Sequence, residues 1–324
     1  MEKNDLSEPV FDFGIPHKTC SFSIIGIGGG AGRIVEKIQK NELPHVDLCV
    51  FGMNGEEIGE LSLAHKYLIG TDGLGSGKDR RMAEVECKKS LPCLEQILAN
   101  RIVSVFIVCL GGGAGEGCIK HFLQKAADLR IKVKLLIVTL PHSSEGMEKR
   151  KNAIKVLGEL EKIADGIFVV DYDALPCHTF SELFEEADKR VTDIANSFFS
   201  LLKVGLTCFD FNDVRSFLGY HSCTKFIDLF TLSGSVDYLK TELKDIQKFL
   251  PAKYVSLEDV SNLIFAIYYN RKVDDNDGLA RELLDVFHDC IIMKLENTEI
   301  KWTMFDVPTM PTGIFRIDIF TKCN

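Results

Sequence analysis

The sequence contains no run of lysine and arginine, and its 47 acidic and 38 basic side chains give a formal net charge of −9. Because faces that bind nucleic acid are positively charged, this composition argues against a nucleic-acid partner. No apolar stretch approaches the roughly 20 residues that span a bilayer. The polar start "MEKNDLSEPVFDF" also lacks the charged-then-apolar order of a signal peptide. We therefore expect a cytoplasmic protein without membrane insertion.

A sequence pattern for metal binding or for disulfides is missing as well. The eleven cysteines are odd in number and scattered, and no C-x-x-C pair occurs. Cys49 and Cys109 lie in apolar runs, where a free thiol behaves as a small hydrophobic side chain. We predict structural cysteines and no metal ligands.

Short β-rich runs alternate with segments of helical period in the first half of the chain, which is typical of a parallel sheet wrapped by helices. The expected strands are residues 20–27, 46–53, 66–70, 103–110, 132–140 and 166–171. The expected helices are residues 31–42, 79–99, 115–129 and 145–162. We predict an α/β fold with a Rossmann-like, doubly wound parallel sheet of strand order 3-2-1-4-5-6.

Residues 179–203 repeat apolar positions at helical spacing for about seven turns, which is too long for an ordinary connector. After the stretch "VGLTCFDFNDVRSFLGY" (204–220), which follows this central helix, the pattern of the chain changes. A polar helical region is expected first, followed by the apolar run "NLIFAIYYN", a helix around 279–292 and the run "GIFRIDIF". We predict that the long helix joins the parallel sheet to a smaller α+β domain.

Two glycine-rich loops, "GIGGGAG" at 26–32 and "GGGAGEG" at 111–117, each follow an expected strand and open a helix. Exposed N–H groups and the helix dipole favour an anion at such a place. Strands one and four are neighbours in the predicted order, and the ligand crevice opens between their carboxyl ends. A third loop, "GTDGLGSGKD" at 70–79, adds backbone donors and Lys78. The three loops therefore predict a polyphosphate site.

Glycine-rich loops after strands also occur without a polyphosphate site. One such turn alone can simply relieve crowding between helix and sheet, but three on one sheet edge point to a ligand. A nicotinamide- or flavin-dependent oxidoreductase is the chemical alternative, since "GIGGGA" fits the loose G-x-G-x-x-G/A pattern. That site needs an acid for the ribose after the second strand, and none occurs before Glu56. The P-loop pattern G-x-x-x-x-G-K-[ST] is absent.

The loops resemble those of the FtsZ and tubulin family of self-assembling GTPases. "CLGGGAGEG" is similar to the family signature GGGTGTG, with Ala114 and Glu116 in place of two threonines. "IIGIGGGAGRIV" and "DGLGSGKD" resemble its first and third phosphate loops. The resemblance extends over about residues 21–320 and is close only in the loops. It implies binding of GTP or GDP with Mg²⁺ by Gly28, Gly29, Gly30, Ala31, Gly32, Arg33, Ser76, Gly77, Lys78, Gly111, Gly112, Gly113, Ala114 and Gly115.

Two further motifs are similar to the parts of the family that hold the nucleoside. "VTLPHSSEG" resembles a loop ending in a ribose-contacting glutamate, here Glu145, with a basic group four residues later, here Lys149. In "LFEEAD", the resemblance implies that Phe184 stacks on guanine and that Asp188 reads its edge. Positions 184 and 188 share one helical face, so both can address one base. The alternative is a core phenylalanine and a solvated helix acid.

"VGLTCFDFNDVR" resembles the loop that the family inserts into the nucleotide site of the next subunit. The resemblance implies that Asp210 and Asp213 are catalytic and polarise the attacking water beside a magnesium-bound γ-phosphate. The alternative is that each acid caps the helix that follows.

The resemblance implies a cytoskeletal GTPase that polymerises head to tail with copies of itself and has a cytoskeletal or division-related adaptor as a partner. Departures from the family pattern are Arg33 and Cys208 in place of asparagines, and Glu116, a carboxylate that would repel phosphate unless Mg²⁺ lies between them. A degenerate scaffold or regulator that binds guanine nucleotide without hydrolysis is the alternative. The predicted parts are an N-terminal tail (1–20), a GTP-binding domain (21–178), the central helix (179–204) and a C-terminal assembly domain (205–324).

Overall fold

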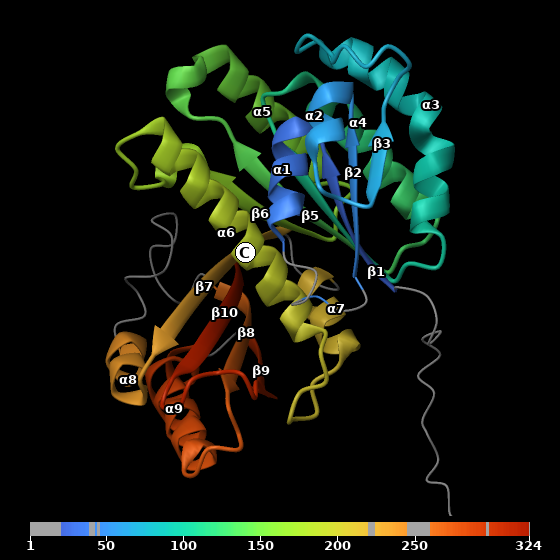
Figure 1. Ribbon diagram of the computed structural model, residues 1–324. Coiled ribbons are helices and arrows are strands. Elements are labelled where there is room, and N and C mark those ends of the chain that lie inside the picture. Colours follow the sequence, from blue (N-terminus) through green and yellow to red (C-terminus); the bar gives the residue numbers. More distant parts are fainter. Residues whose placement is uncertain are drawn as a thin grey trace, which may run out of the picture.

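The structure, a computed structural model, describes residues 21–38, 43, 46–219, 224–244, 260–295 and 298–323. The predicted tail at 1–20 lies outside the described residues. Figure 1 shows a parallel sheet flanked by helices, a long helix running diagonally away from it, and a second group of strands at the far side of that helix. None of the described helices has the length and apolar character needed to cross a membrane.

Six parallel strands form the first half of the sheet, and their order β3-β2-β1-β4-β5-β6 confirms the predicted arrangement. In chain order they are β1 (Phe22–Ile27), β2 (Val46–Gly52), β3 (His65–Leu68), β4 (Val103–Cys109), β5 (Val133–Leu140) and β6 (Gly166–Asp171). Every residue of β5 is buried. Because successive side chains point to opposite faces, Leu135 and Ile137 join one apolar core while Leu136 and Val138 join the other.

The helices of this half cover both faces of the sheet (Figure 1). They are α1 (Gly29–Lys37), α2 (Gly55–Glu60), α3 (Arg80–Leu98), α4 (Gly113–Asp128) and α5 (Met147–Leu160), with 3₁₀ turns η1 (Ser143–Glu145) and η2 (Tyr172–Ala174). The sequence pattern did not predict α2, which is only six residues long. The helix expected at 31–42 begins earlier and ends at Lys37, and residues 39–42 lie outside the described part.

The long helix α6 (Phe180–Leu201) confirms the helix expected at 179–203. Its start is fixed by a capping box, because the Thr179 hydroxyl accepts the Glu182 N–H at 3.2 Å and the Glu182 carboxylate accepts the Thr179 N–H at 3.2 Å. The helix buries one face against both halves of the sheet, from Leu183 in its first turn to Leu201 at its end. Its two ends are therefore anchored at opposite sides of the molecule.

The second half of the sheet has the order β7-β10-β8-β9. Its elements are α7 (Phe211–Gly219), β7 (Phe226–Gly234), α8 (Val236–Lys244), β8 (Val260–Tyr269), α9 (Asn276–Cys290), η5 (Ile292–Lys294), β9 (Glu299–Asp306) and β10 (Phe315–Cys323). The expectation of a helical region after residue 220 is wrong over 226–234, where β7 pairs with β10 and, at two positions, with β6. Phenylalanine, isoleucine and leucine occupy five of its nine positions, so this run fits a strand better than a polar helix.

The loop that follows α6 lies along the outer strand β9. The Leu206 N–H donates to the Met304 carbonyl oxygen at 2.7 Å, and the Thr207 and Thr303 hydroxyls are 3.1 Å apart. A Cβ on Gly205 would lie 2.7 Å from the Thr303 hydroxyl oxygen, so this close approach requires glycine. The loop that carries the predicted catalytic acids is thus fastened to the edge of the sheet.

Lys322, in β10, has a completely buried side chain at the end of α7. Its Nζ donates to the Leu218 carbonyl oxygen at 2.8 Å. Burial, reinforced by the like charge of Lys225, lowers the pKa of Lys322 to about 8. Above pH 8 the folded chain therefore loses this proton before the unfolded chain does, so the contribution of this group to stability rises with pH.

We expect the free energy of unfolding of the wild type, relative to that of Lys322→Met, to increase by up to about 2 kcal/mol between pH 8.0 and 9.5. Urea unfolding of both proteins at several pH values in this interval measures the difference. Other titrating groups are common to both proteins and cancel. Parallel pH profiles would show that Lys322 keeps an ordinary pKa.

Candidate functional site

A cavity of about 730 Å³ opens at the carboxyl ends of the parallel strands. All three glycine-rich loops contribute to its wall, as do the start of α5 and the first turns of α6. The predicted binding residues that line it are Gly28, Gly29, Gly30, Arg33, Ser76, Gly77, Lys78, Gly111, Gly112, Gly113, Ala114, Gly115, Glu145, Lys149, Phe184 and Asp188. The fold therefore brings nearly the whole predicted set together in one place.

The loop at 111–117 follows β4 and is called the fourth loop, and the loops at 26–32 and 70–79 are called the first and the third. The glycines of the first and fourth loops are required by their backbone geometry. Gly28 and Gly111 have φ angles of 91° and 90°, which side chains rarely adopt. A Cβ on Gly113 would lie 2.3 Å from Ser76 Oγ, so the fourth loop packs directly on the third. A Cβ on Gly115 would lie 3.2 Å from the Cys109 carbonyl oxygen, at the end of β4. The absence of side chains lets three loops converge on one cavity.

Ala31 and Gly32 are exceptions, because they do not line the cavity. Both are buried in α1, and the Gly32 N–H already donates to the Gly28 carbonyl oxygen at 2.9 Å. A Cβ on Gly32 would contact Leu61 and Val50, so this glycine serves packing against the sheet. Their place on the inner face of the helix sets these two residues apart from the predicted residues that line the cavity.

Asn54 and Glu57 line the cavity, although neither was predicted to do so. The Asn54 side chain accepts the N–H groups of Glu56 and Glu57 at 3.1 and 3.4 Å and so begins α2. The turn is held against the third loop, because the Gly55 N–H donates to the Gly73 carbonyl oxygen at 2.8 Å. An asparagine two residues before a pair of glutamates is a helix-start signal that could have predicted α2.

Glu116 does not reach the cavity as expected but lies beneath the fourth loop. It is 8% exposed, and its Oε1 accepts the Gly111 N–H at 2.6 Å. Burial raises the pKa of Glu116, and this hydrogen bond opposes the rise. One backbone N–H of the fourth loop is therefore already hydrogen-bonded to this carboxylate. Nearby, burial raises the pKa of Cys109 to about 11, so that cavity-lining thiol is protonated at neutral pH.

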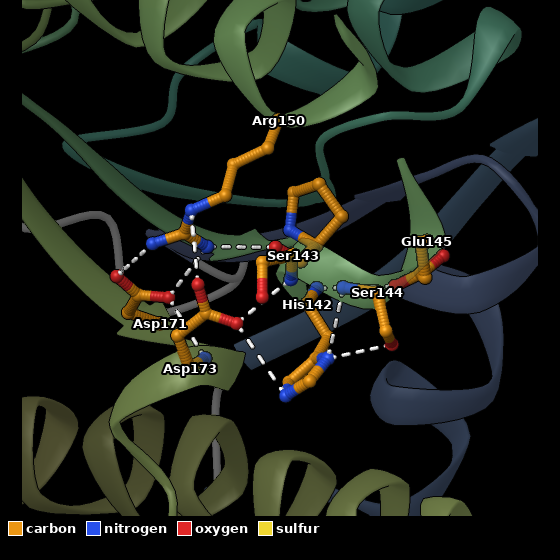
Figure 2. A network of polar contacts seen from close by, with 8 residues as sticks. His142, Ser143, Ser144, Glu145, Arg150, Asp171 and Asp173 are labelled. Atoms are coloured by element: carbon orange, nitrogen blue, oxygen red, sulfur yellow. Dashed lines mark hydrogen bonds and ion pairs between the residues drawn. The ribbon is translucent and has the colours of Figure 1, made fainter. Parts of the chain in front are cut away.

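A polar network fixes the turn η1 that presents Glu145 to the cavity (Figure 2). Arg150 of α5 donates to both carboxylate oxygens of Asp171, at 2.8 and 2.6 Å. Asp173 accepts the Ser143 N–H at 2.7 Å and pairs with Arg150 at 3.2 Å. The hydrogen bonds to Asp171 raise the pKa of the Arg150 guanidinium. This network ties η1 to the turn η2, and through Arg150 to α5 and to the end of β6.

Both oxygens of Glu145 are engaged. Oε1 accepts the His142 N–H at 3.2 Å, and Oε2 lies 2.5 Å from Lys149 Nζ one helical turn later. The predicted pair of an acid and a base four residues apart is therefore formed within the cavity wall.

Phe184 and Asp188 line the cavity from the first turns of α6. Phe184 is 46% exposed and meets Tyr172 edge to face with ring centroids 5.9 Å apart, so it is not a core residue. Asp188 Oδ2 lies 2.6 Å from Lys37 Nζ of α1, and its side chain is only 19% exposed, so it is not a solvated helix acid. An aromatic face and a carboxylate stand together at this end of the cavity.

Asp210 and Asp213 lie outside the cavity, at the start of α7. Asp210 Oδ1 accepts the Asp213 N–H at 3.3 Å, and Asp213 Oδ2 accepts the Asp210 N–H at 2.8 Å, which is a reciprocal capping box. Asp213 also pairs with Lys301 of β9 at 3.2 Å. Since Asp188 and Leu201 are about 20 Å apart along α6, these acids are far from the cavity of their own chain.

Comparison with known proteins shows which family has a matching domain. Residues 21–178, which contain the glycine loops and η1, match the Tubulin/FtsZ family, GTPase domain. This part of the chain is a divergent member of the FtsZ/tubulin superfamily. It is 31% identical over 205 residues to the cell division protein FtsZ 1 of Pyrococcus woesei, and the match covers 60% of this chain and 55% of that one. The match thus spans about half the length of the curated relative.

Solved structures of the superfamily share the whole architecture. An FtsZ dimer from M. jannaschii superposes with a TM-score of 0.78 at 18% identity, over 93% of this chain and 87% of that one. A GTPγS-bound protofilament of CetZ2 from Haloferax volcanii gives a TM-score of 0.73 at 17% identity, over 93% and 92% of the two chains. At these identities the likeness establishes the fold, and it confirms the predicted α/β class including the part after α6.

Within this FtsZ/tubulin fold, the charged residues of the cavity wall depart from the family pattern at three places. Arg33 lines the wall where the family pattern has asparagine, and Lys37 one turn later neutralises Asp188. Glu116 is buried where the pattern has threonine. The arrangement offers backbone donors and Lys78 at one end and an aromatic ring with a carboxylate at the other, which can accommodate the two ends of a purine nucleotide.

Proposed function

We propose that this chain binds GTP in the cavity, assembles head to tail, and hydrolyses GTP at the interface between two copies. The observation that carries the proposal is the separation of the site into two parts. The three glycine loops, Glu145 and Phe184 converge on one cavity, while Asp210 and Asp213 stand at the other end of α6. A second copy is needed to bring the two parts together.

In this proposal the loop backbones and Lys78 bind the phosphates, Glu145 and Lys149 meet the ribose, and Phe184 stacks on the base. The Asp188 carboxylate accepts the N1–H and 2-amino groups of guanine, which adenine does not offer as a pair. Asp210 and Asp213 of the next copy orient water beside the γ-phosphate, whose charge is met by backbone donors and Mg²⁺. The CetZ2 relative forms a GTPγS-bound protofilament, which supports this assignment.

A second candidate function is a scaffold that binds guanine nucleotide without hydrolysis. The capping box favours it, because both acids are already engaged in starting α7 and Asp213 is paired with Lys301. In that case nucleotide binding persists while neither assembly nor phosphate release depends on the two acids.

Right-angle light scattering with simultaneous phosphate release, in Mg²⁺ with GTP, GDP or ATP, distinguishes the two functions. The proposal expects scattering to rise with GTP alone and to decay as phosphate appears. Asp213→Asn is expected to slow hydrolysis about 100-fold without weakening GTP binding, so that scattering persists. The asparagine keeps an oxygen for the Asp210 N–H, which leaves α7 capped.

The matched control is Asp237→Asn, which changes an acid in the first turn of α8 and should behave like the wild type. GTP binding with a flat scattering trace and no phosphate release would replace the proposal by the scaffold function. Lost GTP binding in Asp213→Asn would mean that this acid shapes the site of its own chain.

A further inference from the structure

Glu57 is the carboxylate that reaches the cavity from α2. The Asn54 cap fixes the start of this helix, and the side chain of Glu57 then crosses to the first loop. A Cβ on Gly29 would lie 1.9 Å from Glu57 Oε2, so the carboxylate rests directly against the backbone of Gly29. Gly29 is the first residue of α1, where backbone N–H groups lack helical partners. Glu57 therefore stands beside the place that a phosphate group would occupy.

The other carboxylates of the cavity wall already have a cation. Asp188 is paired with Lys37 at 2.6 Å and Glu145 with Lys149 at 2.5 Å. Within the part of the chain that the structure describes, the Glu57 carboxylate has neither an ion-pair partner nor a hydrogen-bond donor. A phosphate at the start of α1 would lie beside this unpaired negative charge, and like charges at such a distance repel.

A divalent cation between the two anions reverses the sign of this interaction. Mg²⁺ is commonly held by one or two carboxylates together with substrate phosphates, and it keeps several waters. One carboxylate against a glycine loop fits that mode, because the missing side chain at Gly29 lets the carboxylate approach the backbone at the start of α1. We infer that Glu57 is the protein ligand of the divalent cation that accompanies the nucleotide phosphates. The inference rests on the proposed binding of a nucleoside triphosphate.

Glu57 would then lower the nucleotide affinity when the cation is absent and raise it when the cation is present. Without a divalent cation its charge opposes the phosphates, and with one it contributes a ligand. Removal of the charge should therefore have opposite effects under the two conditions. A merely structural role for Glu57 would change both affinities in the same sense.

Calorimetric titration of the full chain with GTPγS, in MgCl₂ and in EDTA, tests this assignment. For the wild type we expect Mg²⁺ to increase the affinity by about tenfold or more. For Glu57→Gln we expect an affinity in EDTA equal to or above that of the wild type, and a gain from Mg²⁺ below about threefold. The matched control is Glu56→Gln, one residue earlier in α2 and not in the cavity wall, which should behave like the wild type.

Binding of Mn²⁺ in the presence of GTPγS, followed by its paramagnetic resonance signal, gives a second readout that does not depend on hydrolysis. Glu57→Gln should bind the ion more weakly than Glu56→Gln does. A full Mg²⁺ gain and unchanged Mn²⁺ binding in Glu57→Gln would overturn the inference while leaving the proposed function in place. If GTPγS fails to bind the wild type both with and without the cation, the proposed function itself is wrong, and the inference with it.

Discussion

Gly113→Val is expected to abolish nucleotide binding, with a loss of at least about 10³-fold in affinity, or about 4 kcal/mol. The new Cβ would lie 2.3 Å from Ser76 Oγ and 2.7 Å from the Lys78 carbonyl carbon, so the third and fourth loops must move apart. Overpacking of this kind costs about 1–3 kcal/mol, and displaced donors lose hydrogen bonds to a charged ligand worth about 1.5–3 kcal/mol each. Calorimetric titration with GTPγS measures the loss.

The matched control for this substitution is Gly158→Val in α5, where a Cβ would meet nothing within 4 Å. It places the same side chain in open space and should leave GTPγS affinity unchanged. Circular dichroism of both variants separates a local change in the loops from unfolding. A folded Gly113→Val protein that retains wild-type affinity would show that the fourth loop does not contact the phosphates.

Arg316→Met is expected to lower the free energy of unfolding by about 3–5 kcal/mol. Arg316 and Asp318 lie on β10, with Nη2 of the arginine 2.8 Å from Oδ2 of the acid, whose side chain is completely buried. The guanidinium also lies over the Tyr268 ring, 4.2 Å from its centroid. Burial raises the pKa of Asp318, and the arginine opposes that rise. Removing the cation leaves a buried carboxylate with only neutral partners such as Thr231.

Urea unfolding measures this loss, and a second substitution tests its cause. Adding Asp318→Asn to Arg316→Met removes the unpaired charge and keeps an acceptor for the Thr231 hydroxyl. The double variant should therefore be more stable than Arg316→Met by about 1–3 kcal/mol. If the second substitution destabilises further, the loss comes from the missing packing on Tyr268 rather than from the uncompensated charge.

The parallel half and the cavity were predictable because local pattern and global fold agree there. Glycine loops after apolar strands determine both the sheet edge and the positions of Gly28 and Gly113. The periodicity of 179–203 likewise predicts α6, since one face of that helix is buried along its whole length. The family resemblance implies the residues at 184 and 188, and their spacing agrees with it, because positions four apart share a helical face.

The remaining features depend on contacts between distant segments. Glu57 enters the cavity because α2 packs on the third loop. The local sequence "NGEEIGE" does not indicate which way this side chain points. Glu116 turns inward to the Gly111 N–H rather than outward to a ligand, a choice that only burial decides. The partner of β7 is likewise distant, because its pairing with β10 joins residues more than 80 positions apart in the sequence.

The loop fastened along β9 also bears on solubility. An open strand edge is a template for further strands, and therefore a starting point for irreversible aggregation. Within the described residues β9 pairs only with β8, and the bond from the Leu206 N–H to Met304 shields part of its outer edge. A chain that meets its own copies at high local concentration would need such a shield. The segment that leads to Asp210 and Asp213 thus also covers part of an edge on which another strand could pair.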